Sequence, residues 1–166
     1  MPKGRYAVMR AYLPTRGDRA LDMMTRTCTV QANFDYPDEA TCGARFRMSM
    51  ATSALLTAMF ANSPYLEGRR TGIASQRSET WEHVDPDRCG LLPWVFEESF
   101  SYERYVDWVL DVPMFFVKRE GEYVKHHRPF REFLEKGFED EQGRHHRATW
   151  ADWELHLSTC LLYTSD

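Results

Sequence analysis

Four short polar side chains recur at every second position of one stretch, the spacing that places them on one face of a β-strand. They are Thr29, Gln31, Asn33 and Asp35, and they alternate with apolar residues throughout 27–35. Hydroxyl, amide and carboxylate oxygens can hydrogen-bond a ligand or coordinate a hard cation. The sequence therefore predicts a strand whose polar face is either a ligand-lining surface or an ordinary solvent-facing one.

Two arginines are candidates for binding a carboxylate. Arg77 lies between Ser75 and Ser78 in a glycine-flanked, otherwise apolar stretch, where a guanidinium could hold a carboxylate through two hydrogen bonds. Arg5, near the start of the chain, allows the same interpretation. A surface salt bridge is the alternative for both side chains.

Several other patterns predict no chemistry. The pairs His126-His127 and His145-His146 are adjacent in sequence, so their side chains diverge and a shared metal is not expected. The 4 cysteines are widely spaced without a CxxC pair, which indicates reduced thiols instead of a disulfide framework or a zinc site. The chain also lacks a P-loop, a GxSxG motif and a GxGxxG motif.

Composition narrows the class of protein. The 166 residues are enough for one domain, and the net charge of -4 gives no electrostatic reason to expect nucleic acid or an anionic membrane as a partner. The start of the chain has no signal-peptide pattern, and no apolar stretch approaches the roughly 20 residues of a membrane span. We therefore expect a cytoplasmic protein, and its oligomeric state stays open.

The elements that must position these residues follow from periodicity and end signals. Helices are expected at 17–26, 38–61, 99–111, 130–136 and from the capping box at 149–152. Segments 114–117 and 123–124 should pair as a hairpin, and 73–78 is either a second short strand or an extended segment. In the long helix, Ala44, Met48, Ala51, Leu55 and Met59 recur at helical spacing, which predicts a buried face.

Longer stretches of the chain match a known family. They include Met1-Pro2-Lys3-Gly4-Arg5-Tyr6, Arg26-Thr27-Cys28-Thr29-Val30-Gln31, Phe60-Ala61-Asn62-Ser63-Pro64, Arg77-Ser78-x-x-Trp81, Leu110-Asp111-Val112-Pro113-Met114 and Asp152-Trp153-Glu154-x-His156-Leu157. Together these stretches resemble glutamate–cysteine ligase in its plant and proteobacterial form, collinearly from residue 1 to about 159. The resemblance implies an α+β fold with a curved, mainly antiparallel sheet covered by helices, as in glutamine synthetase-like enzymes.

The resemblance also implies an activity. Members join the γ-carboxylate of glutamate to the amine of cysteine in the first step of glutathione synthesis, through a γ-glutamyl phosphate and with ATP and Mg²⁺. Glutamate, cysteine and ATP would therefore be the partners. A protein nucleophile is not expected, because phosphoryl transfer depends on positioning and electrostatic stabilisation.

Site residues are carried over position by position. Arg77 resembles the arginine that holds the substrate glutamate, and Arg5 would be a second carboxylate contact. Trp81 and Phe115 would wall the cysteine pocket, although Phe115 stands where the plant enzymes have tyrosine. On the ATP and metal side, Gln31 resembles a metal-ligand or nucleotide-side residue, with Thr29 and Asn33 beside it.

Departures from the family set the expectations for this chain. Members are several hundred residues long, and their acidic metal ligands precede the part that matches here, so residues 1–159 are interpreted as a partial catalytic domain without turnover of its own. Residues 160–166 show no likeness and are interpreted as a truncated or artefactual end. The plant regulatory cysteine pair has no counterpart here, so that redox switch is expected to be absent.

Two alternatives to this function stay open. One is a related ligase that joins glutamate to a different amine. The other is a catalytically inactive, truncated binding module that retains affinity for glutamate or a nucleotide, or that pairs with a missing half.

Overall fold

Helices make up most of the part of the chain that the computed structural model describes, residues 4–97 and 100–160. The α-helices are α1 (Gly4–Tyr12), α2 (Ala20–Arg26), α3 (Glu39–Phe60), α4 (Gln76–Glu82), α5 (Tyr102–Asp111), α6 (Phe130–Lys136) and α7 (Trp150–Cys160). Two short 3₁₀ helices, η1 (Leu13–Thr15) and η2 (Pro93–Phe96), join them.

The strands of the described residues form three antiparallel hairpins: β1 (Tyr65–Leu66) with β2 (Arg69–Arg70), β3 (Phe116–Arg119) with β4 (Glu122–Lys125), and β5 (Phe138–Glu139) with β6 (His145–His146). The mixture of helices and antiparallel strands confirms the α+β class. The curved sheet that the resemblance implies is not confirmed, because the described strands belong to three separate two-stranded hairpins.

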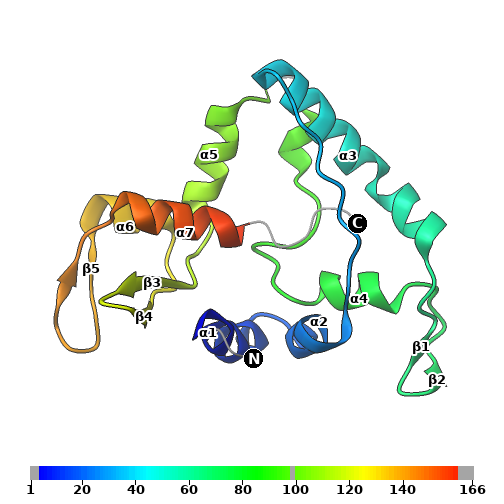
Figure 1. Cartoon of the computed structure of the whole chain (residues 1–166), viewed down its shortest axis with the longest axis horizontal. Helices are drawn as coiled ribbons and strands as arrows, with labels where there is room; N and C mark the ends of the chain where they lie inside the picture. Colours follow the sequence, from blue (N-terminus) through cyan, green and yellow to red (C-terminus); the bar gives the residue numbers. More distant parts are fainter. Residues whose placement is uncertain (1–3, 98–99, 161–166) are drawn as a thin grey trace.

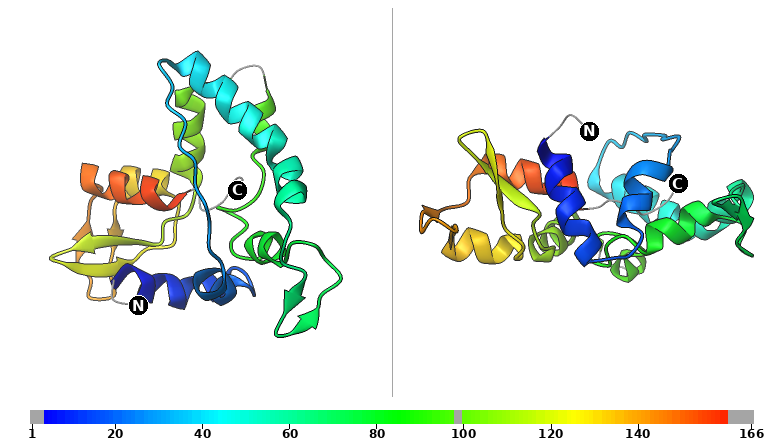
Figure 2. Two further views of the ribbon diagram at one scale, coloured as in Figure 1. Left: turned by 45° about the vertical axis from the view of Figure 1, so that its right-hand side comes forward. Right: turned by 90° about the horizontal axis from the view of Figure 1, so that it is seen from below.

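The helices are arranged as two arms above a lower layer (Figure 1). Helices α3 and α5 meet at their upper ends, α6 and α7 lie beside the hairpin β3–β4, and α1, α2 and α4 lie along the bottom. The segment 27–36 runs from the end of α2 up to the start of α3, which the turned view in Figure 2 shows as well. None of the described helices is long and apolar enough to cross a membrane.

Local end signals account for most of the helices. The carboxylate of Asp38 accepts a hydrogen bond from the Thr41 backbone N–H at 2.7 Å and so begins α3. Thr149 and Asp152 cap α7 reciprocally: the Thr149 N–H donates to the Asp152 carboxylate at 2.9 Å and the Asp152 N–H donates to the Thr149 hydroxyl at 3.4 Å. Gly137 ends α6 with a φ of 68°. The predictions of these helices and of the β3–β4 hairpin are confirmed.

Three predictions from periodicity are wrong. Residues 27–36 form no strand, because no described segment pairs with this backbone. Every side chain from Cys28 to Asp35 is exposed. Residues 73–78 were expected to form a second short strand or an extended segment, but residues 76–78 form the first turn of α4, which Ser75 caps by accepting a hydrogen bond from the Ser78 N–H. The face of α3 that was expected to be buried is exposed, with Met48 at 63%, Leu55 at 60% and Met59 at 67%, because α3 contacts η2 through its other side.

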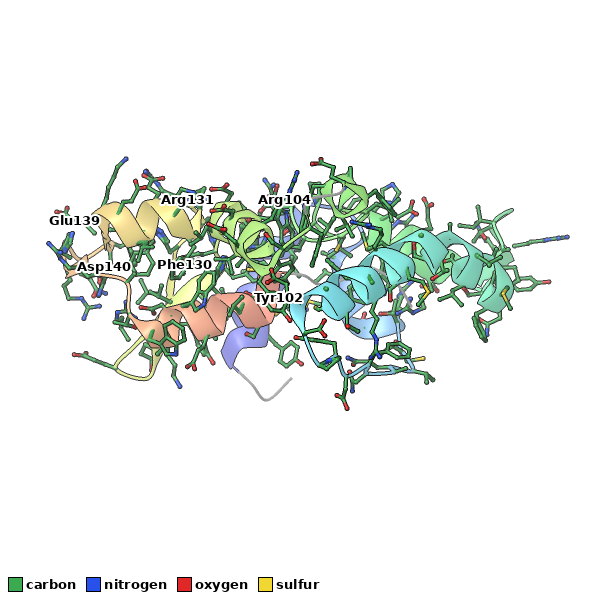
Figure 3. All side chains as sticks on the ribbon, turned by 90° about the horizontal axis from the view of Figure 1, so that it is seen from above. Tyr102, Arg104, Phe130, Arg131, Glu139 and Asp140 are labelled. Carbon is green, nitrogen blue, oxygen red and sulfur yellow. The ribbon has the colours of Figure 1, made fainter. Side chains whose placement is uncertain are left out.

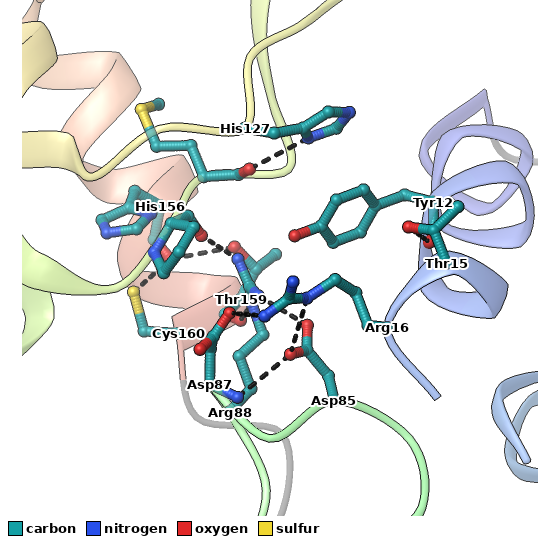
Figure 4. Close-up of polar contacts among 12 residues, drawn as sticks. Tyr12, Thr15, Arg16, Asp85, Asp87, Arg88, His127, His156, Thr159 and Cys160 are labelled. Carbon is teal, nitrogen blue, oxygen red and sulfur yellow. Dashed lines mark hydrogen bonds and ion pairs between the residues drawn. The ribbon is translucent and has the colours of Figure 1, made fainter. Parts of the chain in front are cut away.

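A buried ion pair connects distant segments of the fold (Figure 4). The guanidinium of Arg88 and the carboxylate of Asp85 are both fully buried and lie 2.6 Å apart. Arg88 also donates to the backbone carbonyls of Thr159, at 3.2 Å, and of Pro113. The centre of the Phe115 ring lies 3.9 Å from the guanidinium carbon of Arg88. One side chain therefore joins the segment after α4, the start of the β3–β4 hairpin and the end of α7.

Further ion pairs fasten the elements around α5, α6 and α7. Arg119 holds the buried carboxylate of Asp152 through two hydrogen bonds of 2.6 and 2.8 Å. Arg131 of α6, which Figure 3 labels beside Phe130, binds Asp111 of α5 at 2.7 Å and Asp107 at 3.3 Å. The second set is partly exposed and is expected to contribute less to stability than the first.

The proposed boundary at residue 159 stays a prediction. Cys160 is buried at the end of α7, and residues 161–166 lie outside the described residues. The tail is therefore not assigned any structure.

Loss of the Arg88 side chain should destabilise the whole fold. Replacing Arg88 by Met removes the buried guanidinium and leaves the Asp85 carboxylate with only the longer contact to Arg16, at 3.6 Å. We therefore expect the free energy of unfolding to fall by about 3 to 5 kcal/mol in urea titrations. The matched control is Arg128→Met, because the Arg128 side chain is 68% exposed and its pair with Glu132 is a surface contact. A loss below about 1 kcal/mol for Arg88→Met would show that the ion pair does not hold the fold together.

Acid should weaken the fold through two buried histidines. His126 is 7% and His156 is 2% exposed, and burial lowers the pKa of each to about 4. Because these folded-state pKa values lie below the value of about 6.5 in the unfolded chain, stability is full above pH 6.5 and is lost as the pH falls toward 4. Between pH 7.5 and 5.0 each histidine should cost about 2 kcal/mol of unfolding free energy.

Urea titrations at the two pH values check this slope. The variant His156→Leu should lose about half of the pH dependence, whereas a change at the exposed His145 to Gln should leave it unaltered. Stability that is the same at pH 5.0 and pH 7.5 would contradict the burial of neutral histidines.

Candidate functional site

A cavity of about 390 Å³ lies between α2, the end of α3, the β1–β2 hairpin and α4. Its lining consists of charged and small polar side chains with two residues of β1, namely Asp22, Arg26, Thr27, Ser63, Tyr65, Leu66, Glu67, Gln76, Arg77 and Thr80. Arg77, the candidate carboxylate ligand from the sequence, is therefore part of a cavity and not of a flat surface.

Helix α4 places Arg77 through contacts made by its first turn. The backbone N–H of Gln76 donates to the Ser63 carbonyl at 2.9 Å, and the Arg77 N–H donates to the Ser63 hydroxyl at 3.2 Å. In return the Ser63 N–H donates to the carbonyl of Ala74 at 3.0 Å. These three hydrogen bonds connect the start of α4 to the residues after α3. They therefore fix the relative position of Ser63 and Arg77, which both line the cavity.

The Arg77 side chain bridges two parts of the predicted site. Its Nε donates to the carbonyl of Cys28 at 3.0 Å, and its guanidinium carbon lies 5.6 Å from the centre of the Trp81 ring. Trp81 lies one turn further along α4 and packs on the core cluster that contains Phe115. The structure thus brings together Arg77, Trp81 and the start of the 27–36 segment.

Phe115 and Arg5 are placed differently from Arg77. Phe115 is 2% exposed, packs beneath Arg88, and is not among the residues that line the cavity beside Arg77. Arg5 belongs to α1, and its side chain lies outside the described residues. Their contacts with cysteine and with a carboxylate stay predictions.

The residues expected on the ATP and metal side lie on the exposed 27–36 segment. The amide of Gln31 donates to the Asn33 side-chain oxygen at 3.2 Å, which places these two side chains on the same side of the backbone. The Thr29 hydroxyl donates to the Val30 carbonyl at 3.2 Å. All three side chains are exposed and are therefore accessible to a ligand.

The three residues expected on the ATP and metal side do not supply the ligands of a magnesium ion by themselves. Gln31, Asn33 and Thr29 offer neutral oxygens, whereas Mg²⁺ in proteins usually needs one or two carboxylates. Within residues 4–97 and 100–160, no group of three or more His, Cys, Asp or Glu side chains could bind a metal. The assignment of Gln31 as a metal ligand stays a prediction.

The cavity lining that includes Arg77 also carries a set of ion pairs that sequence reasoning missed. Arg26 of α2 binds Glu67, in the β1–β2 turn, at 2.5 Å and Asp22, one turn earlier on α2, at 3.3 Å. The i, i+4 spacing of Asp22 and Arg26 could have indicated a pair on one helix face. Glu67 joins them only through the tertiary fold, so no local signal marked it.

Chemically, the cavity can bind a small charged molecule. Among its described lining residues are two guanidinium groups, Arg26 and Arg77, and two carboxylates, Asp22 and Glu67. A ligand with carboxylate and ammonium groups would match both kinds of charge. No cysteine is part of this lining, and its hydroxyl groups come from Thr27, Ser63, Tyr65 and Thr80.

Comparison with known proteins gives consistent matches over nearly the whole chain. The model of glutamate–cysteine ligase family 2 (GCS2) matches residues 1–161. Over 160 residues the chain is 49% identical to a chloroplastic glutamate–cysteine ligase of Brassica juncea and 47% identical to that of Arabidopsis thaliana. Each alignment covers 96% of this chain but only 31% and 30% of the relatives, so the chain spans about a third of their length.

The names of these relatives correct one expectation. Both ligases are named as chloroplastic, as is the tobacco ligase that is also 47% identical to this chain. The cytoplasmic location predicted from the sequence is therefore wrong.

Because Cys28 lies on the exposed 27–36 segment, we expect its thiol to react faster than the more buried thiols. Cys28 is exposed, whereas burial raises the pKa of Cys89 to about 11 and that of Cys160 to about 12, which leaves little of the reactive thiolate. Under native conditions at pH 8, a maleimide should modify Cys28 first and Cys160 last, as measured by peptide mass spectrometry. Cys28→Ser should remove the fast phase, and equally fast labelling of Cys160 would contradict the described burial.

Proposed function

The chain belongs to glutamate–cysteine ligase family 2, and we propose that it forms the glutamate-binding part of a ligase that joins glutamate to cysteine in glutathione synthesis. The observation that carries this proposal is the cavity beside Arg77, at the position that resembles the glutamate-binding arginine of the family. Its relatives are named for cysteine, which favours cysteine over another amine as the second substrate.

The proposed reaction has two steps. The γ-carboxylate oxygen of glutamate takes a phosphoryl group, and the cysteine amine then attacks the acyl carbon, loses a proton and displaces phosphate. ATP with Mg²⁺ would supply the phosphoryl group and neutralise the charge that develops on it. The part of this chain is to bind and orient the substrates, because positioned donors and not a protein nucleophile are what such a transfer needs.

Each predicted residue has a part in this proposal. The guanidinium of Arg77 holds a carboxylate of glutamate, and its Nε bond to Cys28 and its contact with Trp81 limit the orientations it can take. Arg5 is proposed as a second carboxylate contact. Trp81 and Phe115 are proposed to border the cysteine site, which requires the Phe115 ring to become accessible there.

The 27–36 segment is proposed to face the nucleotide. Gln31, with Thr29 and Asn33 beside it, would offer oxygen ligands or hydrogen bonds on the ATP and metal side. Because these groups are neutral, carboxylates from elsewhere in a longer ligase would have to complete the magnesium shell. The matched stretch is 31% of the Brassica juncea ligase, so we propose that the chain by itself binds glutamate without turnover.

The location that the relatives support is the plastid. They are named as chloroplastic ligases, and the proposal for this chain follows these names.

A chimeric ligase tests the proposed function. The segment of the Brassica juncea ligase that matches this chain is replaced by residues 1–160, and formation of γ-glutamylcysteine is measured with glutamate, cysteine and ATP. We expect an active chimera, and Arg77→Lys in it should raise the KM for glutamate roughly 10- to 100-fold, because a lysine cannot make the two-pronged contact.

The control and the contradicting results are defined for the same chimera. Arg70→Lys, on the exposed strand β2, should leave the KM for glutamate unchanged. An active chimera in which Arg77→Lys also leaves that KM unchanged would refute the role of Arg77, and a folded but inactive chimera would count against the proposed part of this chain in the ligation.

A further inference from the structure

The ion pairs in the cavity lining that includes Arg77 form a connected set that spans two elements. Arg26 lies between Asp22 on its own helix, at 3.3 Å, and Glu67 in the β1–β2 turn, at 2.5 Å. All three residues line the same cavity as Arg77. The contact between Arg26 and Glu67 therefore joins the hairpin to α2 at the edge of the candidate site.

This set is accessible, so it is poorly explained as a device for stability. The side chains of Arg26 and Glu67 are 47% and 67% exposed, and ion pairs of that exposure contribute little to folding free energy. The Asp22 side chain is more covered, at 24%, and also lies 3.4 Å from Arg19. Asp22 is thus the more covered partner of Arg26, and Glu67 is the more exposed partner that a ligand can reach.

The backbone at Glu67 supports a specific use of this side chain. Glu67 has a φ of 52°, in the left-handed region that residues other than glycine seldom adopt, and Gly68 follows with a φ of 74°. Glycine or asparagine at residue 67 would relieve this strain, yet the turn carries a glutamate that lines the cavity and whose carboxylate contacts Arg26. The conformation directs an acidic group toward the ligand space beside Arg77.

We propose that Glu67 is the residue that recognises the α-ammonium group of the substrate amino acid, with Asp22 positioning Arg26 beside it. The inference rests on the proposed function, since it concerns the same cavity. On binding, the ammonium group replaces Arg26 as the partner of Glu67, and Arg26, still held by Asp22, joins Arg77 in facing the two carboxylates of glutamate. Each charge that loses an internal partner gains one from the ligand, so the exchange leaves no charge unpaired.

The consequence is selectivity for amino acids over plain dicarboxylates. Glutarate has both carboxylates of glutamate but no ammonium group, so it gives Glu67 no new partner and cannot release Arg26 without leaving Glu67 unpaired. Glutamate should therefore bind more tightly than glutarate, by about tenfold for one partly exposed, charge-assisted contact.

Titrations of the chain itself with L-glutamate and with glutarate at pH 7.5, followed by calorimetry or NMR, test this inference. We expect the tenfold preference in the unaltered chain and its loss in Glu67→Gln. In that variant glutamate loses the partner of its ammonium group, and glutarate binds no more weakly than before because Arg26 no longer leaves a charged partner. Glu67→Asp, which keeps the charge on a shorter side chain, should retain part of the preference. Glu82→Gln, an exposed acidic residue of α4 outside the cavity lining, should retain all of it.

The outcomes separate this inference from the function on which it rests. Equal Kd values for glutamate and glutarate in the unaltered chain, or a preference that survives in folded Glu67→Gln, would overturn the role of Glu67. If Arg77→Lys still weakens both ligands in that case, the carboxylate site stands. Absence of binding by either ligand would count against the glutamate cavity itself and so against both proposals.

Discussion

The buried guanidinium of Arg88 is the contact on which the arrangement of the other elements depends. A charge that is fully removed from water must be paired and hydrogen-bonded, and Arg88 meets this requirement only when Asp85, Pro113 and the end of α7 are all in place. These segments are more than twenty residues apart from one another in sequence, so the interaction selects one tertiary arrangement (Figure 4). The ion pair is connected to the core beside α4, because the Phe115 ring lies against Arg88 and Trp81 packs against the cluster that contains Phe115.

The candidate site is positioned by this core on one side and by surface contacts on the other. Buried packing holds α4 from behind, while Ser63 and the carbonyl of Cys28 fix its first turn and the Arg77 side chain. The hairpin β1–β2 has only two residues in each strand and is joined to α2 through Arg26 and Glu67. The part of the cavity formed by α4 is therefore held by buried packing and hydrogen bonds, whereas the part formed by the hairpin is held by exposed ion pairs.

Signals within a few residues predicted much of the fold. The caps at Asp38 and Thr149, the glycine after α6 and the two short segments that pair as β3 and β4 are local signals, and these elements formed as expected. The alternation at 27–35 is equally regular, yet a strand also needs a neighbour, and no described segment pairs with it. The apolar face of α3 failed in the same way, because periodicity reports what a helix can bury and not what is present to cover it. Arg77 could be named from its type and resemblance, whereas Glu67 depends on a turn that brings it to Arg26 across about forty residues.

The central claim is that the cavity beside Arg77 receives glutamate, and the NMR signal of the Arg77 Nε–H group tests it most directly. In the structure this group donates to the Cys28 carbonyl and its guanidinium lies against Trp81, so a carboxylate that binds there must alter its shielding. The account predicts that L-glutamate shifts the Arg77 Nε–H and Trp81 indole signals together and saturably, while the signal of the buried Arg88 Nε–H stays in place. Saturable binding that leaves the Arg77 signal unchanged would place glutamate elsewhere and contradict the account.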